Sequence, residues 1–389
     1  MMALSRADTS ILGRWWWSVD RWTLAALLTL VGFGYVMVLA AAPAVAERIG
    51  ASSRNMFFVK QVLFLGGASA VMAGVSLLSP KGVRRAALLG FLVALLLTMA
   101  TLVIGAEVKG ARRWLNLPLL GSLQPSEFLK PCFAVVAAWL ISEAKMAGRR
   151  GWMAWGMALG LYGLVALVLQ RQPDIGMLLV VSFVFFTQVF VAGINLAIVS
   201  MLGGLGVGGI VGAYFLFDHV HKRINQFLYG EGGNSYQVDV ALEAFGAGGL
   251  MGVGPGEGRM KNVLPDAHAD FVFAVMGEEY GLVVCLLVLA LFTFIVVRGL
   301  ARLLAETDLF VILAASGLLA QFGLQSFINM ASSLHLIPTK GMTLPFVSYG
   351  GSSVVAIALG MGFLLALTRR RMNRAEEGAA PLGATGGIR

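Results

Sequence analysis

The chain has 389 residues, of which 58% are hydrophobic and only 13% are charged, and its mean hydropathy is +0.83. Soluble domains carry about 25% charged residues, so this composition excludes a soluble globular protein and predicts an all-α polytopic membrane protein. The formal net charge of +9 could suit nucleic acid, but the basic residues are scattered among short segments between apolar runs, which membrane topology explains better.

The N-terminal segment, residues 1–21, contains the consecutive tryptophans Trp15 to Trp17 and then Arg21. Tryptophan and basic side chains are enriched where a helix meets the membrane surface. Because no small-residue cleavage site follows, we expect an interfacial anchor here and not a cleavable signal peptide. Farther along, Cys132 and Cys285 both fall inside apolar runs, which predicts small core residues and no disulfide framework.

The apolar runs predict about ten transmembrane helices, at about 20 residues for each span. They lie near residues 22–42, 57–78, 85–105, 127–144, 152–170, 174–192, 194–216, 270–297, 309–331 and 344–368. An even number places both termini on one side, and the basic cluster after the last span indicates that this side is cytoplasmic. The membrane domain is therefore expected to cover residues 22–370, with a disordered cytoplasmic tail at 371–389.

Two segments are expected outside the membrane. Residues 106–126 read AEVKGARRWLNLPLLGSLQPS, and residues 217–269 form one large extracytoplasmic loop between helices 7 and 8. Long loops in compact proteins are usually functional or disordered. The large loop contains YQVDVALEAFGA, which is expected to form a short helix, followed by a glycine-rich run.

The first outside segment gathers basic and polar residues around the start of span four. These candidate substrate-binding residues are Lys109, Arg112, Arg113, Trp114, Gln124, Ser126, Glu127 and Lys130. Glu127 and Lys130 are spaced i,i+3, so they face the same side of a helix. Arginine forks and lysine charges suit a phosphate group. The alternative is interfacial snorkelling of the basic side chains together with one structural ion pair.

Further polar insertions are expected near the same membrane face. RQPDIG (171–176) places Arg171 and Asp174 around a proline, and SYGGSS (348–353) supplies Ser348 and Ser352, while Lys340 precedes a glycine. Each could be structural by itself. Several of them in the outer leaflet together predict a polar cavity there.

The stretch LPDAHADFVFAVMG (264–277) places Asp266, His268 and Asp270 beside an apolar run. If a helix begins at Asp266, then Asp270, Ala274, Gly277 and Gly281 share one face of small residues, along which a ligand or a helix could approach closely. The alternative is that Asp270 caps this helix or pairs with a basic residue.

The acids that follow in the same run are expected to be secondary. At helical spacing, Glu278 borders the small-residue face and Glu279 points away from it. The glycine-rich run GAGGLMGVGPGEG (246–258) fits neither the Walker pattern nor GxGxxG. No nucleotide cofactor is therefore predicted.

Six motifs occur in a fixed order along these segments: KGARRWL, LQPSEFLK, QPDIG, NSYQVDVALEAFGAGGLMGVG, LPDAHADFVFAVMGEEYG and PTKGMTLPFVSYGGSS. Together they resemble the SEDS family of bacterial membrane glycosyltransferases (shape, elongation, division and sporulation proteins) over roughly residues 20–370. The PTKGMTLPF and LPDAHADF stretches are closer to the division branch than to the elongation branch.

This resemblance implies a septal peptidoglycan glycosyltransferase of the inner membrane, which polymerises lipid II into glycan strands at the outer membrane face during cell division. It also implies a class B penicillin-binding protein transpeptidase and other divisome membrane proteins as partners. The essential acid of the family falls on Asp270, with Ala269 where Thr is usual and Asp266 where Glu is usual. Arg113, Glu127 and Lys130 carry over as cavity residues.

In the expected mechanism, Asp270 removes a proton from the acceptor hydroxyl. Arg113 and Lys130, with Lys109 or Arg112, would hold the pyrophosphate, either alone or with a divalent cation such as Mg²⁺ or Mn²⁺. His268 is expected beside the substrate at the interface. A lipid II flippase, an elongation-type polymerase and a scaffolding division protein are the alternatives; a flippase should need a polar path that reaches both leaflets.

Overall fold

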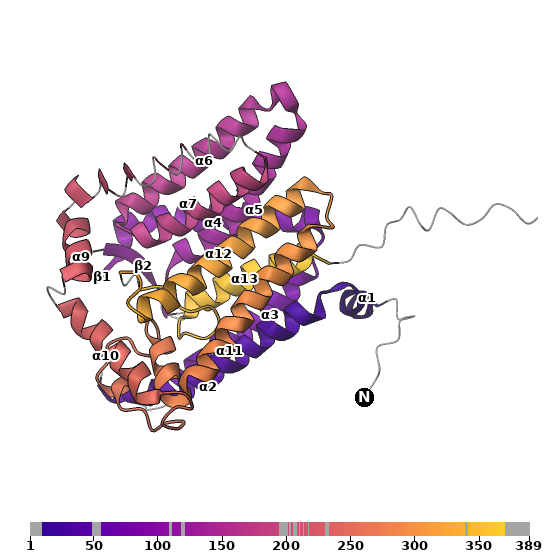
Figure 1. Cartoon of the computed structure of the whole chain (residues 1–389). Helices are drawn as coiled ribbons and strands as arrows, with labels where there is room; N and C mark the ends of the chain where they lie inside the picture. Colours follow the sequence, from indigo (N-terminus) through magenta and orange to yellow (C-terminus); the bar gives the residue numbers. More distant parts are fainter. Residues whose placement is uncertain are drawn as a thin grey trace, which may run out of the picture.

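The structure is a computed structural model that describes residues 10–48, 56–108, 111–117, 121–193, 218–229, 233–338 and 341–369, with scattered residues between 201 and 216. The chain forms a bundle of long helices with short elements gathered at its ends (Figure 1). The N-terminal segment before Ser10, the tail from residue 370 and most of the predicted span 194–216 lie outside the described residues.

Nine of the ten predicted spans coincide with a described helix. These helices are α2 (Arg21–Arg48), α3 (Met56–Ser76), α4 (Pro80–Ile104), α5 (Pro125–Met146), α6 (Trp152–Arg171), α7 (Ile175–Val191), α11 (Val272–Leu303), α12 (Leu309–Ser333) and α13 (Gly351–Leu367). In the described part of the chain, six helices are long and apolar enough to cross a membrane, and α7 and α13 are shorter apolar helices. The all-α polytopic prediction is confirmed.

The centre of the bundle consists of α5, α12 and α13, which pack against one another. On α5, the run from Leu129 to Ala138 is almost fully buried, and on α13 Phe363 to Leu367 is buried in the same way. Cys132 and Cys285 are buried free thiols, as predicted. Because the outer helices shield these three from lipid, their polar side chains can support a site inside the membrane domain.

One end of the bundle, which we call the terminal end, carries both ends of the described chain (Figure 1). The short helix α1 (Ile11–Ser18) docks there through Trp15, whose Nε1 donates to Ser76 Oγ at 2.8 Å. After α13, the Arg369 guanidinium donates to the carbonyls of Leu77 and Leu78. This arrangement is the one that an even number of spans requires.

Asp20 ties three helices together at the terminal end. Its carboxylate accepts from Arg298 Nε at 2.7 Å and Nη2 at 2.8 Å, and from Thr23 Oγ1 at 2.8 Å. Arg302 Nη1 lies 3.3 Å from the same carboxylate, and Arg302 Nη2 donates to Thr368 O. Asp20 therefore joins the start of α2 to α11, and Arg302 of α11 links this junction to the end of α13.

At the opposite end, which we call the site end, the segment between α4 and α5 forms a small antiparallel sheet that the sequence did not predict. Strand β2 (Ala111–Leu117) pairs with β1 (Ala106–Val108) on one side and β3 (Gly121–Leu123) on the other. Short strands with charged side chains carry weak sequence signals. The sheet is packed on α4 and α5.

In its described residues, the predicted large loop 217–269 contains two α-helices and one short 3-10 helix (Met260–Asn262). The expected short helix is confirmed as α10 (Gly233–Gly248), and a further helix, α9 (Asp218–Tyr229), was not predicted. Helix α10 packs along the first turns of α11. Its continuation wraps around a break in α11 at Gly281, whose φ of +76° interrupts the helix.

Candidate functional site

The prediction that a helix begins at Asp266 is wrong. Residues 266–271 form consecutive turns, in which Asp266 has φ +52° and its carbonyl accepts from the backbone N–H groups of Ala269 and Asp270 at 3.0 Å. Helix α11 begins only at Val272. Asp270 therefore lies on a turn before the helix, where its side chain is not committed to the helix surface.

Asp270 is half-buried, and a hydrogen bond to its backbone carbonyl fixes its position. The carbonyl oxygen of Asp270 accepts a hydrogen bond from Asn329 Nδ2 at 2.9 Å. Its carboxylate lies beside Gly341, which has φ +61° and at which a Cβ atom would come within 3.3 Å of Oδ2. Any side chain at position 341 would thus be strained and would crowd the carboxylate.

Ser348 and His268 hold the turn that carries Asp270 against the segment before α13. Ser348 is fully buried; its hydroxyl donates to Ala269 O at 2.6 Å and accepts from Leu344 N at 2.8 Å. The backbone N–H of Tyr349 donates to His268 O at 2.8 Å, and the two rings lie 5.1 Å apart. These contacts give both residues a supporting role beside Asp270; direct substrate contact stays a prediction.

Glu127 and Lys130, which were expected on one face of a helix, form the ion pair of the alternative, structural interpretation, with Lys130 Nζ 2.9 Å from Glu127 Oε2. The Lys130 side chain is only 2% exposed and the Glu127 side chain 12%. Lys130 Nζ also donates to Gln325 Oε1 at 2.9 Å. Gln325 Nε2 in turn donates to Thr343 O at 3.2 Å.

Residues 341–343 connect this ion pair to Asp270. Gly341 adjoins the Asp270 carboxylate, Met342 O accepts from Asn329 Nδ2 at 2.6 Å, and Thr343 is held by Gln325. The acid therefore adjoins this short backbone segment directly, and the Glu127–Lys130 pair is linked to it through Gln325. Sequence distance hid this arrangement, because the partners come from α5, α12 and the turns before α11 and α13.

Gln124, Ser126 and Ser352 lie next to this group. The backbone N–H of Gln124 donates to Ser352 Oγ at 3.3 Å, and Gln124 Nε2 donates to Ser126 Oγ at 3.3 Å. The neighbouring Ser353 Oγ is 2.6 Å from Thr343 Oγ1. These hydroxyl and amide groups attach the start of α5 to the start of α13.

Arg113 and Asp174 meet at the α6–α7 turn, away from the Lys130 network. Arg113 donates to Gln172 O at 3.2 Å and to Pro173 O at 2.6 Å, and its Nε lies 3.7 Å from Asp174 Oδ2. Asp174 also caps α7 through Met177 N at 3.3 Å. With these carbonyls as acceptors, Arg113 anchors β2 to the turn; a role in holding pyrophosphate stays a prediction.

Arg112 faces the opposite side of β2. It pairs with Glu107 at 3.3 Å, and both side chains are about half exposed. Together with Arg171 they line a surface cavity of about 200 Å³. Trp114 is half-buried on the same strand and lies across from Ala106. Lys109 and Lys340 fall outside the described residues.

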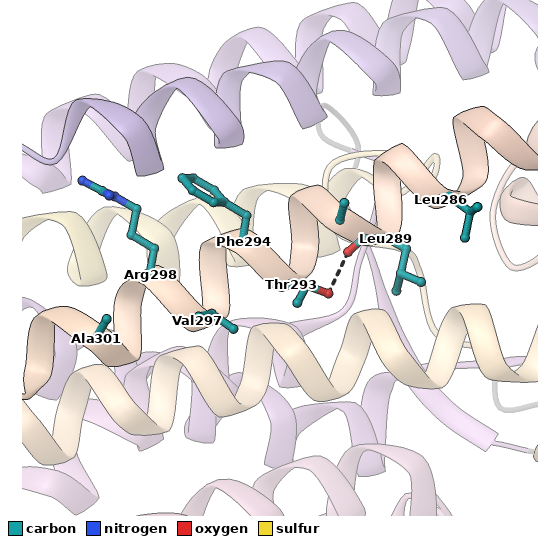
Figure 2. Close-up of a pocket in the computed structure, with 8 residues that line it drawn as sticks. Leu286, Leu289, Thr293, Phe294, Val297, Arg298 and Ala301 are labelled. Atoms are coloured by element: carbon teal, nitrogen blue, oxygen red, sulfur yellow. Dashed lines mark hydrogen bonds between the residues drawn. The ribbon is translucent and has the colours of Figure 1, made fainter.

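A groove of about 580 Å³ runs along the outward face of α11 and contains none of the predicted site residues (Figure 2). Apart from Arg298 and Thr293, its lining is apolar. A ligand site normally combines an apolar lining with a few convergent polar groups. This groove lacks them, whereas the Asp270 neighbourhood has several.

The small-residue face of α11 serves helix packing. A Cβ atom at Gly277 would overlap the Phe245 ring of α10, and Phe245 also lies 5.7 Å from the Phe273 ring. The close approach of α10 therefore explains why this face has small residues, and no ligand is needed to explain them.

Glu279 was expected to point away from the small-residue face, and it is buried together with Glu278. Glu278 and Glu279 are 2% and 1% exposed. Glu279 Oε1 pairs with Lys261 Nζ at 2.5 Å, and Glu278 Oε1 accepts from the N–H groups of Arg259 and Met260. Both carboxylates therefore face the loop that wraps the break of α11 at Gly281.

The donors near Asp270 fit a cation only if the substrate completes its coordination. The described residues contain no group of three or more His, Cys, Asp and Glu side chains placed to hold a metal ion. The half-buried Asp270 carboxylate could supply one ligand. Mg²⁺ is commonly held by one or two carboxylates together with substrate phosphates and water, so pyrophosphate oxygens would have to provide the rest.

Gln325 and Asn329 are the two site residues that the sequence reasoning missed. They are spaced i,i+4 on α12 and are 2% and 1% exposed. A weak signal was present, because Gln321, Gln325 and Asn329 form an i, i+4, i+8 row of amides in an otherwise apolar span. Polar side chains inside a span usually face the protein interior and mark a function.

Comparison with known proteins gives one consistent group. A family model for cell cycle proteins of the FtsW, RodA and SpoVE type matches residues 21–373. A probable peptidoglycan glycosyltransferase FtsW from Caulobacter vibrioides is 42% identical over 371 residues, covering 95% of this chain and 94% of that protein.

Two solved structures share the architecture. A peptidoglycan synthase complex that coordinates polymerization and crosslinking matches with a TM-score of 0.74 and 28% identity, over 90% of this chain and 97% of that chain. The rod shape determining protein RodA of Thermus thermophilus matches with a TM-score of 0.64 and 28% identity, over 91% of this chain and 97% of that one.

Proposed function

Since the chain belongs to the FtsW, RodA and SpoVE family of cell cycle proteins, we propose that it is a peptidoglycan glycosyltransferase that polymerises lipid II. The SEDS resemblance of the sequence is thereby confirmed. The relatives that carry the name FtsW favour the septal, division-type polymerase over the elongation type. As a multi-pass membrane protein, it would act at the outer face of the inner membrane.

The observation that supports this proposal most strongly is the junction at residues 341–343. The Asp270 carboxylate lies beside Gly341 of this segment, and the buried Lys130 is linked to Thr343 of the same segment through Gln325. Glycosyl transfer from a lipid pyrophosphate needs a base for the acceptor and a positive group for the leaving pyrophosphate. We propose Asp270 as the base and Lys130 as the positive group.

In the proposed reaction, the Asp270 carboxylate takes the proton of the acceptor 4-hydroxyl. The oxygen then attacks the anomeric carbon of the donor sugar. The bond from that carbon to the pyrophosphate oxygen breaks, and undecaprenyl pyrophosphate leaves with the electron pair. General-base assistance of this kind contributes about 10²–10⁴-fold in rate. The activated pyrophosphate bond supplies the driving force.

Lys130, held between Glu127 and Gln325, is proposed to stabilise charge on the leaving pyrophosphate. A divalent cation bound by the pyrophosphate and by Asp270 would add to this stabilisation. Arg112 and Arg171, which line the surface cavity at the α6–α7 turn, are proposed as additional positive charges for the substrate. Lys109 and Lys340, which lie within the motifs KGARRWL and PTKGMTLPF, are proposed as additional cations.

A class B penicillin-binding protein is proposed as the partner that crosslinks the strands, with other divisome membrane proteins at the septum. Support comes from the similar chain in a peptidoglycan synthase complex. Cytoplasmic termini are proposed from the basic residues at the terminal end, among them Arg298, Arg302 and Arg369. This orientation places Asp270 and Lys130 outside.

The second candidate, a lipid II flippase, is distinguished by an assay without a membrane. Purified full-length chain, together with its transpeptidase partner in detergent, is given lipid II, and the products are separated by gel electrophoresis. Glycan strands are expected, because polymerisation needs no second compartment. Failure to form strands in a preparation that binds lipid II would contradict the polymerase.

A further inference from the structure

Two amides of α12 stand between the proposed base and the proposed cation. Gln325 Oε1 accepts from Lys130 Nζ at 2.9 Å, while Gln325 Nε2 donates to Thr343 O at 3.2 Å and lies 3.4 Å from Thr343 Oγ1. Asn329 Nδ2 donates to Asp270 O at 2.9 Å and to Met342 O at 2.6 Å. The four groups that the amides touch belong to three different parts of the chain.

The chemistry of these contacts requires amides. Gln325 must accept from an ammonium group and donate to a carbonyl, and among uncharged side chains of this length only glutamine does both. Asn329 donates to two carbonyl oxygens, which only its nitrogen can do. Its own Oδ1 is buried and has no hydrogen-bond partner among the described residues. Such an orphaned acceptor is costly inside a protein and calls for a compensating role.

Helix α12 fixes the distance between these two amide side chains. Residues 325 and 329 are four apart on α12, a rise of about 6 Å at 1.5 Å for each residue. They hold the consecutive residues 342 and 343 on one side, and on the other side the peptide of Asp270 and the ammonium of Lys130. A rigid, largely buried helix therefore sets the separation of the acid and the cation.

We propose that Gln325 and Asn329 are positioning residues, which hold Asp270 and Lys130 at the separation that glycosyl transfer requires. The inference rests on the proposed role of Asp270 as base. Neither amide touches the reacting atoms. Both act through the Met342–Thr343 backbone and through their direct contacts to Asp270 O and Lys130 Nζ.

Isosteric apolar substitutions test this role with a matched control. Asn329→Leu and Gln325→Met remove the contacts at nearly constant volume. Gln321→Met makes the same change one turn earlier on the same face, where the side chain is 5% exposed and has no hydrogen bond to residues 341–343, Asp270 or Lys130 among the described contacts. All three variants are made in the full-length chain in complex with its transpeptidase partner.

We expect Asn329→Leu and Gln325→Met to lower kcat for lipid II polymerisation by about 10–100-fold, the effect of displacing a reacting group by about 1 Å. KM should change little, because the loss falls on the transition state. Gln321→Met should keep the wild-type kcat. A fall in kcat of the same size in all three variants, following their melting temperatures, would overturn the inference.

A double-mutant cycle provides the readout that a merely structural role would not move. Gln325→Met and Asn329→Leu should be strongly non-additive in kcat, because each releases the same two-residue segment. Asn329→Leu and Gln321→Met should be additive. Full additivity of the first pair would contradict joint positioning.

The role of Asp270 as the base is tested separately, with the Asp270→Asn variant. Near-normal polymerisation by Asp270→Asn would remove the premise that Asp270 is the base, and the positioning of Asp270 would fall with it. If Asp270→Asn is inactive and the first pair is additive, the base assignment survives and only the positioning inference fails.

Discussion

At the scale of single residues, Lys130 shows how burial changes the meaning of an ion pair. On an exposed helix, an i,i+3 pair contributes little. Here the Lys130 side chain is 2% exposed, its Glu127 partner 12%, and Gln325 provides a further acceptor. Removing one member leaves the other charged and buried, which is much more costly than never having the pair.

We therefore expect Lys130→Met to abolish polymerisation and to lower the free energy of unfolding by about 3–5 kcal/mol. The double variant Glu127→Gln with Lys130→Met should recover most of the stability, since no buried charge remains, but none of the polymerisation. Thermal melting and the lipid II assay measure the two effects. Substantial polymerisation by the double variant would contradict a role for the Lys130 charge in the reaction.

Individual residues were predicted unevenly from the sequence. Glu127 and Lys130 were correctly expected on one helix face because i,i+3 spacing is a local property, and their ion pair was the structural alternative. The partners of Lys130 and Asp270 on α12 were missed, because the fold alone brings residues 325 and 329 to positions 130 and 270. Arg113 was expected near the pyrophosphate, whereas three carbonyl and carboxylate groups of the α6–α7 turn surround it.

At the scale of elements, α11 is divided by Gly281 and its break is held by the loop that follows α10. The N–H groups of Leu282 and Val283 donate to Gly249 O and Leu250 O across this break. A Cβ atom at Gly281 would overlap Leu250 O and Gly252 N, and its φ is +76°. Only glycine combines this conformation with this close approach.

Gly281→Ala is accordingly expected to destabilise the protein by more than about 1 kcal/mol and to expose the loop of residues 249–262 to protease. Gly160→Ala on α6 is the matched control, since nothing lies within 4 Å of a Cβ there. It should be neutral or stabilising by about 0.5–1 kcal/mol. Equal melting temperatures and equal cleavage of the two variants would contradict the account of the break.

The Asp20 junction at the terminal end predicts a pH dependence. Burial by itself raises the pKa of Asp20, but hydrogen bonds from Arg298 and Thr23 and the charge of Arg302 outweigh it and leave the pKa below the ordinary value of 3.8. A carboxylate with a lowered folded-state pKa stabilises the fold above its unfolded-state pKa. That contribution is lost as the pH falls through the folded-state value.

Asp20→Asn should therefore lower stability by about 1.5–3 kcal/mol at neutral pH, the range for hydrogen bonds to charged groups. The difference in melting temperature between this variant and the wild type should shrink as the pH falls below 3.8. A difference that stays constant from neutral pH into this acid range would contradict the role of the Asp20 charge.

At the scale of the whole molecule, apolar runs of about 20 residues predicted the bundle because lipid requires every span to satisfy its own backbone hydrogen bonds. The three-stranded sheet at residues 106–123 and helix α9 were not predicted, since short elements outside lipid carry no such constraint. The turn at 266–271 was mistaken for a helix start because an acid after a proline is a common entry signal. The fold there instead follows tertiary contacts to Ser348 and Tyr349.

The bundle also carries its Asp20 junction and its candidate site at opposite ends. The terminal end joins α2, α11 and α13 through Asp20 and its arginines. The site end carries Asp270, Lys130 and the amides of α12. A polymerase that acts on one side of the membrane needs its chemistry at only one end, whereas a flippase should need a polar path through both.

The central claim is that the Asp270 carboxylate is the base for lipid II polymerisation, and one measurement tests it most directly. The full-length Asp270→Asn variant, purified in complex with its transpeptidase partner, is compared with the wild type for strand formation, lipid II binding and melting temperature. Strand formation is predicted to be lost while lipid II binding and melting temperature stay at wild-type values. Near-normal strand formation by Asp270→Asn would contradict the account.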